Sequence, residues 1–308
     1  MGYGRIKIFL SGGGTGGSVS PLLAIAEELK NTPFNKGGVG GFKFLWLGTK
    51  NGPGKEMVGK EGIEFKAIAG GKFRRYFSLK NFADLFLIAI GFVQSFFIIL
   101  KWKPDLVISA GSFSSVPVVW AAWILRVPIL VHQQDVRPGL ANKLMAPLAK
   151  IITVAFEKSL ADYGRKAVWT GNPIRQALLT KSGKNTPFNK GGVGGFKSGI
   201  ERVGVLPTVL IIGGGTGAMA INKLVWKSLD ELTKFCQVMH VTGKSKTPHL
   251  TKGVRGIFPA GNETEKGYQH FEFLNAEQMA EAYNAVEIIV SRAGMGVLTE
   301  LSYLGKPA

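Results

Sequence analysis

Cysteine is almost absent from the sequence, since Cys236 is the only one among 308 residues. A single thiol excludes an internal disulfide and a metal site built from several cysteines. The N-terminus also lacks a cleavable signal sequence, because only a short apolar segment follows Arg5 and Lys7. Together these absences predict a protein of the reducing cytoplasm.

Acidic residues are scarce as well: 20 Asp and Glu stand against 38 Lys and Arg, which gives a net charge of +18. Such an excess favours an anionic partner, either nucleic acid, a phosphate-bearing ligand or an anionic membrane. No recognisable nucleic-acid-binding motif accompanies the charge, so no nucleic-acid partner is expected. Hydrophobic residues make up 45% of the chain, which excludes general disorder, and the length suggests two domains.

One peptide, KNTPFNKGGVGGFK, occurs twice without change, at Lys30–Lys43 and at Lys184–Lys197. The sequences around the two copies differ completely, which indicates a recent insertion rather than the duplication of a domain. Gly, Asn and Pro are typical of loops, and loops accept insertions at little cost. We therefore expect an inert surface insertion, with a glycine-rich ligand loop as the alternative.

Short apolar segments alternate with longer segments of helical periodicity along the chain. This alternation predicts an α/β fold of parallel sheets with helices on both faces. The strands expected in a first sheet are Ile6–Leu10, Phe44–Leu47, Phe65–Ile68, Leu106–Ser109, Ile129–His132, Ile151–Val154 and Val168–Thr170. A second sheet is expected from Thr208–Ile212, Val238–Val241, His270–Phe273 and Ile288–Ser291. The clearest helices are Pro21–Lys30, Val116–Leu125, Ile221–Leu232 and Ala276–Asn284.

Two of these strands run into the same kind of glycine-rich turn before a helix, at Gly12–Gly17 and at Gly213–Ala218. Each is the expected first turn of a Rossmann-like unit, where helix-terminal amides bind phosphate, so two such units facing a cleft are predicted. Close packing of helix on strand is the alternative use of these glycines. The next strands end without the acid that a nicotinamide cofactor requires, and no Walker A sequence is present. A dehydrogenase is therefore not expected.

The expected domains are residues 1–172, a linker at 173–206 that holds the second copy of the peptide, and residues 207–308. The second domain is expected to be incomplete. Gly305–Pro307 resembles Arg126–Pro128, which is expected to connect a helix to the next strand, and the sequence then stops. A domain cut at the start of a strand loses part of its core.

The segment Phe82–Leu100 is apolar over almost the length needed to cross a bilayer. The strand expected after it should join the same sheet as Ile6–Leu10, which argues against a spanning helix. So does a stripe of small or polar residues along it, formed by Asp84, Gly91 and Ser95. A basic and aromatic segment precedes it, which suits an anionic lipid surface; a buried helix beside a solvated loop is the alternative. The basic residues are Lys72, Arg74, Arg75 and Lys80.

Several motifs resemble those of the MurG family of peptidoglycan glycosyltransferases, in the same order along the chain. They are Gly13–Pro21, Gly111–Pro117, His132–Asp135 with Gly139 and Asn142, Gly171–Arg175, Gly213–Asn222, His240–Lys244 and Ser291–Glu300. They cover nearly the whole chain apart from the repeated peptide. Together they are far more specific than either glycine turn.

The resemblance implies a GT-B fold and inverting transfer of N-acetylglucosamine from UDP-N-acetylglucosamine to lipid I, undecaprenyl-diphospho-N-acetylmuramoyl-pentapeptide, to form lipid II. It implies no cofactor or required metal, and peripheral binding to the cytoplasmic face of the membrane. Arg175 would neutralise the diphosphate, Leu274 and Met279 would line the uracil pocket, and Glu300 would accept hydrogen bonds from the ribose. The other substrate contacts that it implies are Thr15, Gly16, Gly17, Asp135, Asn142, Gly215, Thr216, Met295, Gly296, Val297, Leu298 and Thr299.

The sequence departs from the family pattern at the candidate general bases. Ser18 stands where the family has histidine, and a serine hydroxyl is a poor base at neutral pH. Asp135 replaces an asparagine and is the other candidate base, while Gln133 replaces a glutamate. Gly215 and Val297 also replace polar residues, and the glutamine pair expected beyond the next strand is absent.

Three other interpretations of the whole chain stay open: a catalytically inactive fragment, a diacylglycerol glycosyltransferase, and a non-enzymatic membrane-binding module. At the level of residues, His132 fits a structural role at a strand end better than a catalytic one. Arg292 either positions the nucleotide loop or pairs locally. Glu27 and Glu28 fit an exposed helix face.

The resemblance generates a binding prediction. Calorimetric titration of the folded chain should detect heat with UDP sugars and little heat with an unrelated dinucleotide, because the acid that a dinucleotide ribose requires is missing from the end of the strand that follows each turn. Strong dinucleotide binding without any response to UDP sugars would contradict this prediction.

Overall fold

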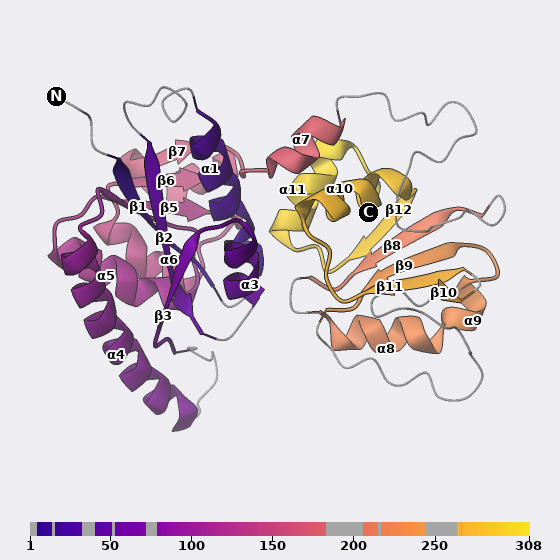
Figure 1. Cartoon of the computed structure of the whole chain (residues 1–308), viewed down its shortest axis with the longest axis horizontal. Helices are drawn as coiled ribbons and strands as arrows, with labels where there is room; N and C mark the ends of the chain where they lie inside the picture. The colour runs from indigo at the N-terminus through magenta and orange to yellow at the C-terminus, as the bar shows by residue number, and fades with distance from the viewer. Residues whose placement is uncertain are drawn as a thin grey trace. The chain divides into compact units, whose positions relative to one another are not determined.

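A computed structural model of the chain describes residues 5–13, 16–32, 41–50, 53–71, 79–182, 206–214, 217–243, 264–265 and 267–308. It divides into two compact units, Met1–Pro173 and Ile174–Ala308 (Figure 1). Each unit is an α/β layer structure around one sheet of its own, so the two are described separately.

The first unit is built on a seven-stranded parallel sheet in the order β3-β2-β1-β4-β5-β6-β7. The order reverses between β1 and β4, as it does in a doubly wound Rossmann sheet. Side chains on both faces of the central strands are buried, which explains why the strands are continuously apolar in sequence. The strands are β1 (Ile6–Ser11), β2 (Phe42–Thr49), β3 (Glu64–Ile68), β4 (Leu106–Ser109), β5 (Ile129–Gln133), β6 (Ile151–Val154) and β7 (Ala167–Trp169).

Helices cover both faces of this sheet. One core packs the strands against α1 (Ser20–Asn31) and α3 (Pro53–Lys60) through buried residues such as Leu22 and Val58. A second core packs them against three further helices, α4 (Leu79–Trp102), α5 (Val116–Ile124) and α6 (Leu140–Met145). Short 3₁₀ helices complete the unit: η1 (Gly16–Ser18), η2 (Phe113–Ser115), η3 (Ala146–Leu148), η4 (Glu157–Asp162) and η5 (Gly164–Lys166).

The second unit holds a five-stranded sheet in the order β10-β11-β9-β8-β12. Its strands are β8 (Thr208–Ile212), β9 (Gln237–Val241), β10 (Thr264–Glu265), β11 (Tyr268–Phe271) and β12 (Ile288–Ser291), and only the pairing of β10 with β11 is antiparallel. The four parallel strands repeat the β3-β2-β1-β4 order of the first unit, with a reversal between β8 and β12. The helices are α7 (Gln176–Ser182), α8 (Met219–Lys227), α9 (Leu229–Leu232), α10 (Ala276–Ala285) and α11 (Met295–Leu304).

The structure corrects two of the expected elements. The strand expected at His270–Phe273 begins earlier, at Tyr268, because its hydrogen-bonded register aligns Tyr268 with Val238 of β9. The helix expected at Ile221–Leu232 is interrupted at Ser228, which separates α8 from α9. Helix α3 and strand β10 were not expected from the sequence.

The first copy of the repeated peptide contributes to regular structure at both ends. Lys30 and Asn31 form the last residues of α1, and Phe42 and Lys43 begin β2. Phe42 packs against the core that α1 and α3 share with the sheet. The centre of this copy, at residues 33–40, and the whole second copy lie outside the described residues.

Helix α4 is the crossover connection between β3 and β4, which belong to the same sheet. Its segment Asp84–Trp102 is long and apolar enough to cross a membrane by length and composition. The helix buries a narrow stripe, Gly91, Ser95 and Ile99, against the unit. Its other faces expose large apolar side chains: Leu85, Phe86, Leu87, Ile90, Val93, Phe97 and Leu100. The basic residues from Lys72 to Lys80 lie outside the described side chains.

The contact of α4 with the loop after β3 gives a stability prediction. A methyl group at Gly91 would overlap the carbonyl oxygen of Ala69, so Gly91→Ala should lower the free energy of unfolding by about 2 kcal/mol. Gly59→Ala on α3 is the matched control, because an added Cβ there meets no atom within 4 Å and should be neutral or mildly stabilising. Urea unfolding of both variants measures the difference, and equal effects would contradict the close packing of Gly91 against the Ala69 carbonyl.

Candidate functional site

Ligands of open parallel sheets bind at the carboxyl ends of the strands, where the strand order reverses. In the first unit this position lies at the ends of β1 and β4, and in the second unit at the ends of β8 and β12. Both glycine-rich turns predicted from the sequence follow the first strand of these pairs. The two positions therefore define the candidate sites, one in each unit.

The turn after β1 is held in place by side chains that bond to its backbone. An added Cβ at Gly12 would lie 2.5 Å from the carbonyl oxygen of Ser18, so only glycine allows the turn to fold back on the helix start. The buried Trp46 indole donates a hydrogen bond to the Gly12 carbonyl at 3.1 Å. Ser18 Oγ donates to the Gly13 carbonyl at 3.0 Å and lies 3.2 Å from the Gly13 amide.

These bonds bear on Ser18 as a candidate base. Its side chain is buried, and its one hydroxyl proton is directed to the Gly13 carbonyl. The geometry favours a role in holding the turn over a role in proton abstraction. Gly16 and Gly17 begin the 3₁₀ helix that follows, whereas Thr15 lies outside the described residues.

The loop after β4 is strained at a residue that is not glycine. Ser112 has φ 84° and ψ 141°, a combination that L-residues rarely adopt. It nevertheless caps η2, because Ser112 Oγ accepts a hydrogen bond from the Ser114 amide. Ser115 also stabilises this loop, since its hydroxyl donates a hydrogen bond to the Gly111 carbonyl at 2.9 Å. Such strain is concentrated at functional sites, which supports this loop as part of the site.

The loop after β5 is organised around the buried side chain of Gln133. Its amide nitrogen donates to the carbonyl oxygens of Asp135 and Arg137 at 2.6 and 3.1 Å. Its amide oxygen accepts from the Tyr163 hydroxyl at 3.0 Å and from the side-chain nitrogen of Asn142. All the bonding capacity of Gln133 is therefore used to shape the loop that carries Asp135.

Asn142 leaves one polar atom unsatisfied. Its Oδ1 is buried and has no hydrogen-bond partner within the described part of the chain, and it faces Gly111. Orphaned buried acceptors are rare in folded proteins and call for a ligand or water donor. Asn142 therefore lies beside the loop after β4, and its contact with a substrate stays a prediction.

Asp135 and His132 follow each other closely but differ in environment. Asp135 is exposed, so its carboxylate is accessible to a substrate. His132 is buried, with Nε2 at 2.9 Å from Asn172 Oδ1 and Nδ1 at 2.9 Å from Thr153 Oγ1. The acceptor at Asn172 assigns the proton to Nε2, and burial lowers the pKa of His132, which keeps the ring neutral. These contacts fit the structural role that the sequence favours for His132.

The second glycine turn folds in the same way as the first. An added Cβ at Gly213 would lie 2.5 Å from the amide nitrogen of Ala218, and the Gly217 amide donates to the Gly214 carbonyl at 2.9 Å. Asn222, fully buried on α8, donates to the Thr242 carbonyl at 2.8 Å and bonds His240 Nε2 at 3.0 Å. Gly215 and Thr216 lie outside the described residues.

His240 is neutral like His132. Burial, reinforced by the nearby His270, lowers the pKa of His240 to about 4. Its Nδ1 lies 3.1 Å from the hydroxyl of Tyr268, so it links β9 to β11 as well as to α8. The network fixes the start of α8 behind the second glycine turn without placing a charge there.

Charged groups of the second unit meet at Glu300 on α11. Tyr283 donates a hydrogen bond to Glu300 Oε2 at 2.8 Å. Burial raises the pKa of Glu300 to about 7, although the Tyr283 hydrogen bond and the positive charge of Arg175 both act to lower it. Arg175 is itself buried, just before α7. The carboxyl is therefore poised between its two protonation states at neutral pH.

The remaining predicted donor contacts lie in the same unit. Leu274 is buried in the core of the second unit, and Met279 and Val297 are partly buried against the same core. Residues Met295 to Thr299 form the first turns of α11, whose N-cap residue, Gly294, provides no side-chain cap. Its first amides are therefore available to an acceptor oxygen. Arg292 is exposed beside them.

Sequence reasoning did not identify Tyr283, Tyr163 or Gln133 as parts of the sites. Periodicity places Tyr283 on the buried face of a helix, but no local signal directs its hydroxyl to Glu300, which lies 17 positions later. Within the described residues, no group of three or more His, Cys, Asp or Glu side chains is placed to hold a metal ion.

Comparison with known proteins agrees with this geometry. Residues 8–154 match the N-terminal domain of glycosyltransferase family 28, and residues 208–308 match its C-terminal domain. Over 305 residues, 98% of this chain, the sequence is 39% identical to a UDP-N-acetylglucosamine--N-acetylmuramyl-(pentapeptide) pyrophosphoryl-undecaprenol N-acetylglucosamine transferase from Clostridium botulinum strain Langeland, of which it spans 77%. The chain belongs to the MurG family of glycosyltransferases.

Solved structures place the MurG-family chain in the same fold. The crystal structure of Acinetobacter baumannii MurG matches 97% of this chain and 77% of its own, with a TM-score of 0.57 and 21% identity. A UDP-GlcNAc 2-epimerase from Neisseria meningitidis, solved with UDP-GlcNAc bound, matches with a TM-score of 0.63 and 13% identity, over 98% of this chain and 81% of its own. The GT-B type of α/β fold predicted from the sequence is thereby confirmed.

The raised pKa of Glu300 predicts opposite effects on stability and on binding. Its folded pKa of about 7 lies above the ordinary value of 4.5, so its contribution to stability is present below about pH 4.5 and is lost as the pH rises through about 7. Glu300→Gln cannot ionise and should be more stable than the parent chain at pH 8 by about 1–3 kcal/mol. If Glu300 binds the ribose as the family resemblance implies, the variant should nevertheless bind UDP-N-acetylglucosamine more weakly, because an amide offers one acceptor oxygen where a carboxylate offers two.

Urea unfolding at pH 5 and pH 8, with calorimetric titration of the sugar nucleotide, measures both effects. Glu272→Gln is the matched control, because Glu272 is an exposed acid of the same unit. An identical pH dependence of stability in the two variants would contradict the raised pKa of Glu300.

Proposed function

We propose that this chain transfers N-acetylglucosamine from UDP-N-acetylglucosamine to lipid I with inversion at the anomeric carbon, forming lipid II. The observation that carries the proposal is the pair of glycine turns at the two strand-order reversals, together with Arg175 and Glu300, which interact with each other in the second unit. A charged group for a diphosphate and a carboxyl group for a ribose are the chemistry that a sugar nucleotide requires.

The second unit supplies the donor contacts in this proposal. Arg175 neutralises the diphosphate, and the turn after β8 adds backbone amides at the N-terminal side of α8. Leu274 and Met279 contact the uracil, and Glu300 accepts hydrogen bonds from the ribose hydroxyls. Charge on the departing UDP is then stabilised by fixed protein groups as the glycosidic bond breaks.

The first unit supplies the acceptor contacts and the base. The acceptor 4-hydroxyl attacks the anomeric carbon in one displacement, and its proton passes to a protein carboxylate. Asp135 is the candidate, because it is exposed on the loop that Gln133 holds in shape, whereas the Ser18 proton is bonded to the Gly13 carbonyl. The unsatisfied Oδ1 of Asn142 is available to a donor group of the substrate.

The exposed apolar surface of α4 supports peripheral association with the cytoplasmic face of the membrane. A contiguous apolar surface of this kind on a folded unit is typical of a protein or membrane contact. A substrate with a prenyl chain stays in the bilayer, so an enzyme that binds the surface meets its acceptor there.

A transfer assay tests the activity and the base together. The folded chain should transfer radiolabelled N-acetylglucosamine to lipid I in detergent, and Asp135→Ala should lower kcat by about 10²-fold or more while the donor KM changes little. Glu157→Gln removes an exposed acid of the same unit and serves as the matched control. Unaltered turnover in Asp135→Ala would eliminate Asp135 as the base.

A different result would contradict the proposed transfer activity itself. If the wild-type chain is folded and binds UDP-N-acetylglucosamine but transfers nothing to lipid I, it is a catalytically inactive member of the family.

A further inference from the structure

One buried tyrosine of the second unit is bonded to the carboxyl group that the proposed function assigns to the ribose. Tyr283 lies on α10 and is fully buried, and its hydroxyl donates to Glu300 Oε2 at 2.8 Å. Its ring belongs to the same core as the buried Leu210, Leu274 and Leu301. Because a close-packed core holds its side chains in fixed rotamers, the hydroxyl has a defined position next to α11.

The Tyr283 hydroxyl stays protonated and serves Glu300 as a hydrogen-bond donor. Burial and the negative charge of Glu300 both raise the pKa of Tyr283, so the hydroxyl keeps its proton. The hydrogen bond favours the ionised form of Glu300, since it acts to lower the pKa of that carboxyl group. An ionised carboxylate only accepts hydrogen bonds, whereas a protonated carboxyl group also donates one.

The bond to Tyr283 leaves most of the acceptor capacity of Glu300 for a ligand. A carboxylate has about four acceptor sites on its two oxygens, and Tyr283 occupies one of them. No other donor among the residues that the structure describes bonds to this carboxyl group. Glu300 is only partly buried, so a ligand can reach it. The arrangement therefore presents an oriented carboxylate whose Oε1 can accept from hydroxyl groups.

Orientation matters for the recognition of a sugar. A glutamate side chain rotates about several bonds, and ordering it when a ligand binds costs conformational entropy. A hydrogen bond from a tyrosine fixed in the core orders the carboxylate before the ligand arrives. Ribose presents adjacent 2′- and 3′-hydroxyls, whereas 2′-deoxyribose presents only the second of these. An acceptor fixed in place distinguishes them, because the missing hydroxyl leaves part of its hydrogen-bonding capacity unused.

We propose that Tyr283 is a positioning residue that holds Glu300 as a ribose-specific acceptor, so that the chain selects a ribonucleotide donor over its 2′-deoxy counterpart. The inference rests on the proposed function, in which Glu300 bonds to the ribose of the sugar nucleotide, and it adds the group that makes this contact selective. Arg175 also acts on Glu300, but its positive charge favours any nucleotide diphosphate and does not distinguish the two sugars.

Calorimetric titration of the full chain with two probes tests the proposal. The probes are UDP-N-acetylglucosamine and its analogue without the 2′-hydroxyl of the ribose, and the ratio of their Kd values measures the selectivity. Tyr283→Phe keeps the ring in the core and removes only the hydroxyl. The matched control is Tyr303→Phe, because Tyr303 is an exposed tyrosine on α11 of the same unit. Circular dichroism verifies the folding of each variant.

The wild-type chain should bind the ribose probe about tenfold or more tightly than the 2′-deoxy probe, as expected for a hydrogen bond to a charged group. Tyr283→Phe should lower this ratio by about threefold or more, and Tyr303→Phe by less than about twofold. Weaker binding of both probes by Tyr283→Phe with an unchanged ratio would show that Tyr283 is only structural, and would overturn the proposal.

A double-mutant cycle shows whether Tyr283 acts through Glu300. In Glu300→Gln the selectivity should already be largely lost, so the addition of Tyr283→Phe should change the ratio by less than about twofold. A further loss of selectivity equal to that of Tyr283→Phe alone would mean that the two residues act independently, which contradicts the proposal.

The pH dependence of binding is a second readout that a structural role would not change. Tyr283 on α10 and Arg175 before α7 are the groups that act to lower the pKa of Glu300. Loss of the Tyr283 donor should raise this pKa. As the pH is lowered, the affinity for UDP-N-acetylglucosamine should therefore decline at a higher pH in Tyr283→Phe than in the wild type. Identical pH profiles would contradict the proposal.

Failure of this proposal differs from failure of the proposed function. Equal binding of the two probes by the wild-type chain overturns the role of Tyr283, while transfer to lipid I can still be observed. A chain that binds with the expected selectivity and transfers nothing contradicts the transfer activity but supports the role of Tyr283.

Discussion

Both candidate sites depend on a glycine whose backbone lies closer to neighbouring atoms than a residue with a Cβ could lie. At Gly12 and at Gly213 the turn folds back onto the first residues of the following helix, and a Cβ at either position would overlap backbone atoms there. This close return lets a parallel strand pass directly into a helix at the carboxyl edge of the sheet. It leaves the first amides of that helix at the edge where a phosphate can reach them.

Hydrogen bonds from neutral side chains position these turns and the helices that follow them. Trp46 and Ser18 bond to the first turn, while Asn222 and His240 fix the helix behind the second. His132 and His240 are both buried, and burial lowers the pKa of each ring. These neutral side chains therefore add no charge next to the turns, whereas Arg175 and Glu300 are ionisable groups of the second unit that interact with each other.

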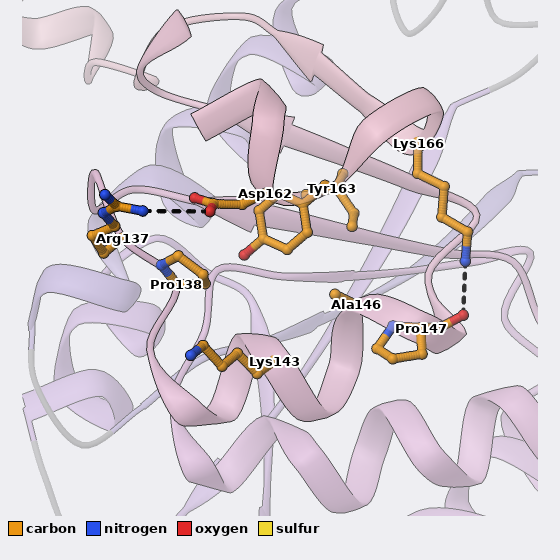
Figure 2. Close-up of a pocket in the computed structure, with 9 residues that line it drawn as sticks. Arg137, Pro138, Lys143, Ala146, Pro147, Asp162, Tyr163 and Lys166 are labelled. Atoms are coloured by element: carbon orange, nitrogen blue, oxygen red, sulfur yellow. Dashed lines mark hydrogen bonds and ion pairs between the residues drawn. The ribbon is translucent and has the colours of Figure 1, made fainter. Parts of the chain in front are cut away.

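The first unit also combines two surfaces of different chemistry. Among the described side chains of helix α4, Gly91, Ser95 and Ile99 are buried and Phe92, Phe96 and Ile98 are partly buried against the core, whereas seven large apolar side chains are exposed. The surface around Lys143, in contrast, carries the cationic side chains of Arg137 and Lys166 (Figure 2).

The sequence by itself determined the alternation of strands and helices, the two glycine turns and the family to which the chain belongs. Buried parallel strands must be apolar on both faces, and the tight turns require glycine, so these features are local and visible in the order of residues. Leu106–Ser109, Ile151–Val154, Thr208–Ile212 and Ile288–Ser291 have the boundaries expected of them. Asp135, Arg175 and Glu300 were identified only through motifs that resemble a known family.

Tertiary structure decided which groups those residues meet. The register of β11 follows its pairing with β9, and the hydroxyl of Tyr283 reaches Glu300 only because α10 and α11 pack together. The hydrogen bond from the Ser18 hydroxyl to the Gly13 carbonyl and the unsatisfied oxygen of Asn142 are decided in the same way. Such properties depend on distances between residues remote in sequence, and those distances exist only after the sheet has brought its strand ends together.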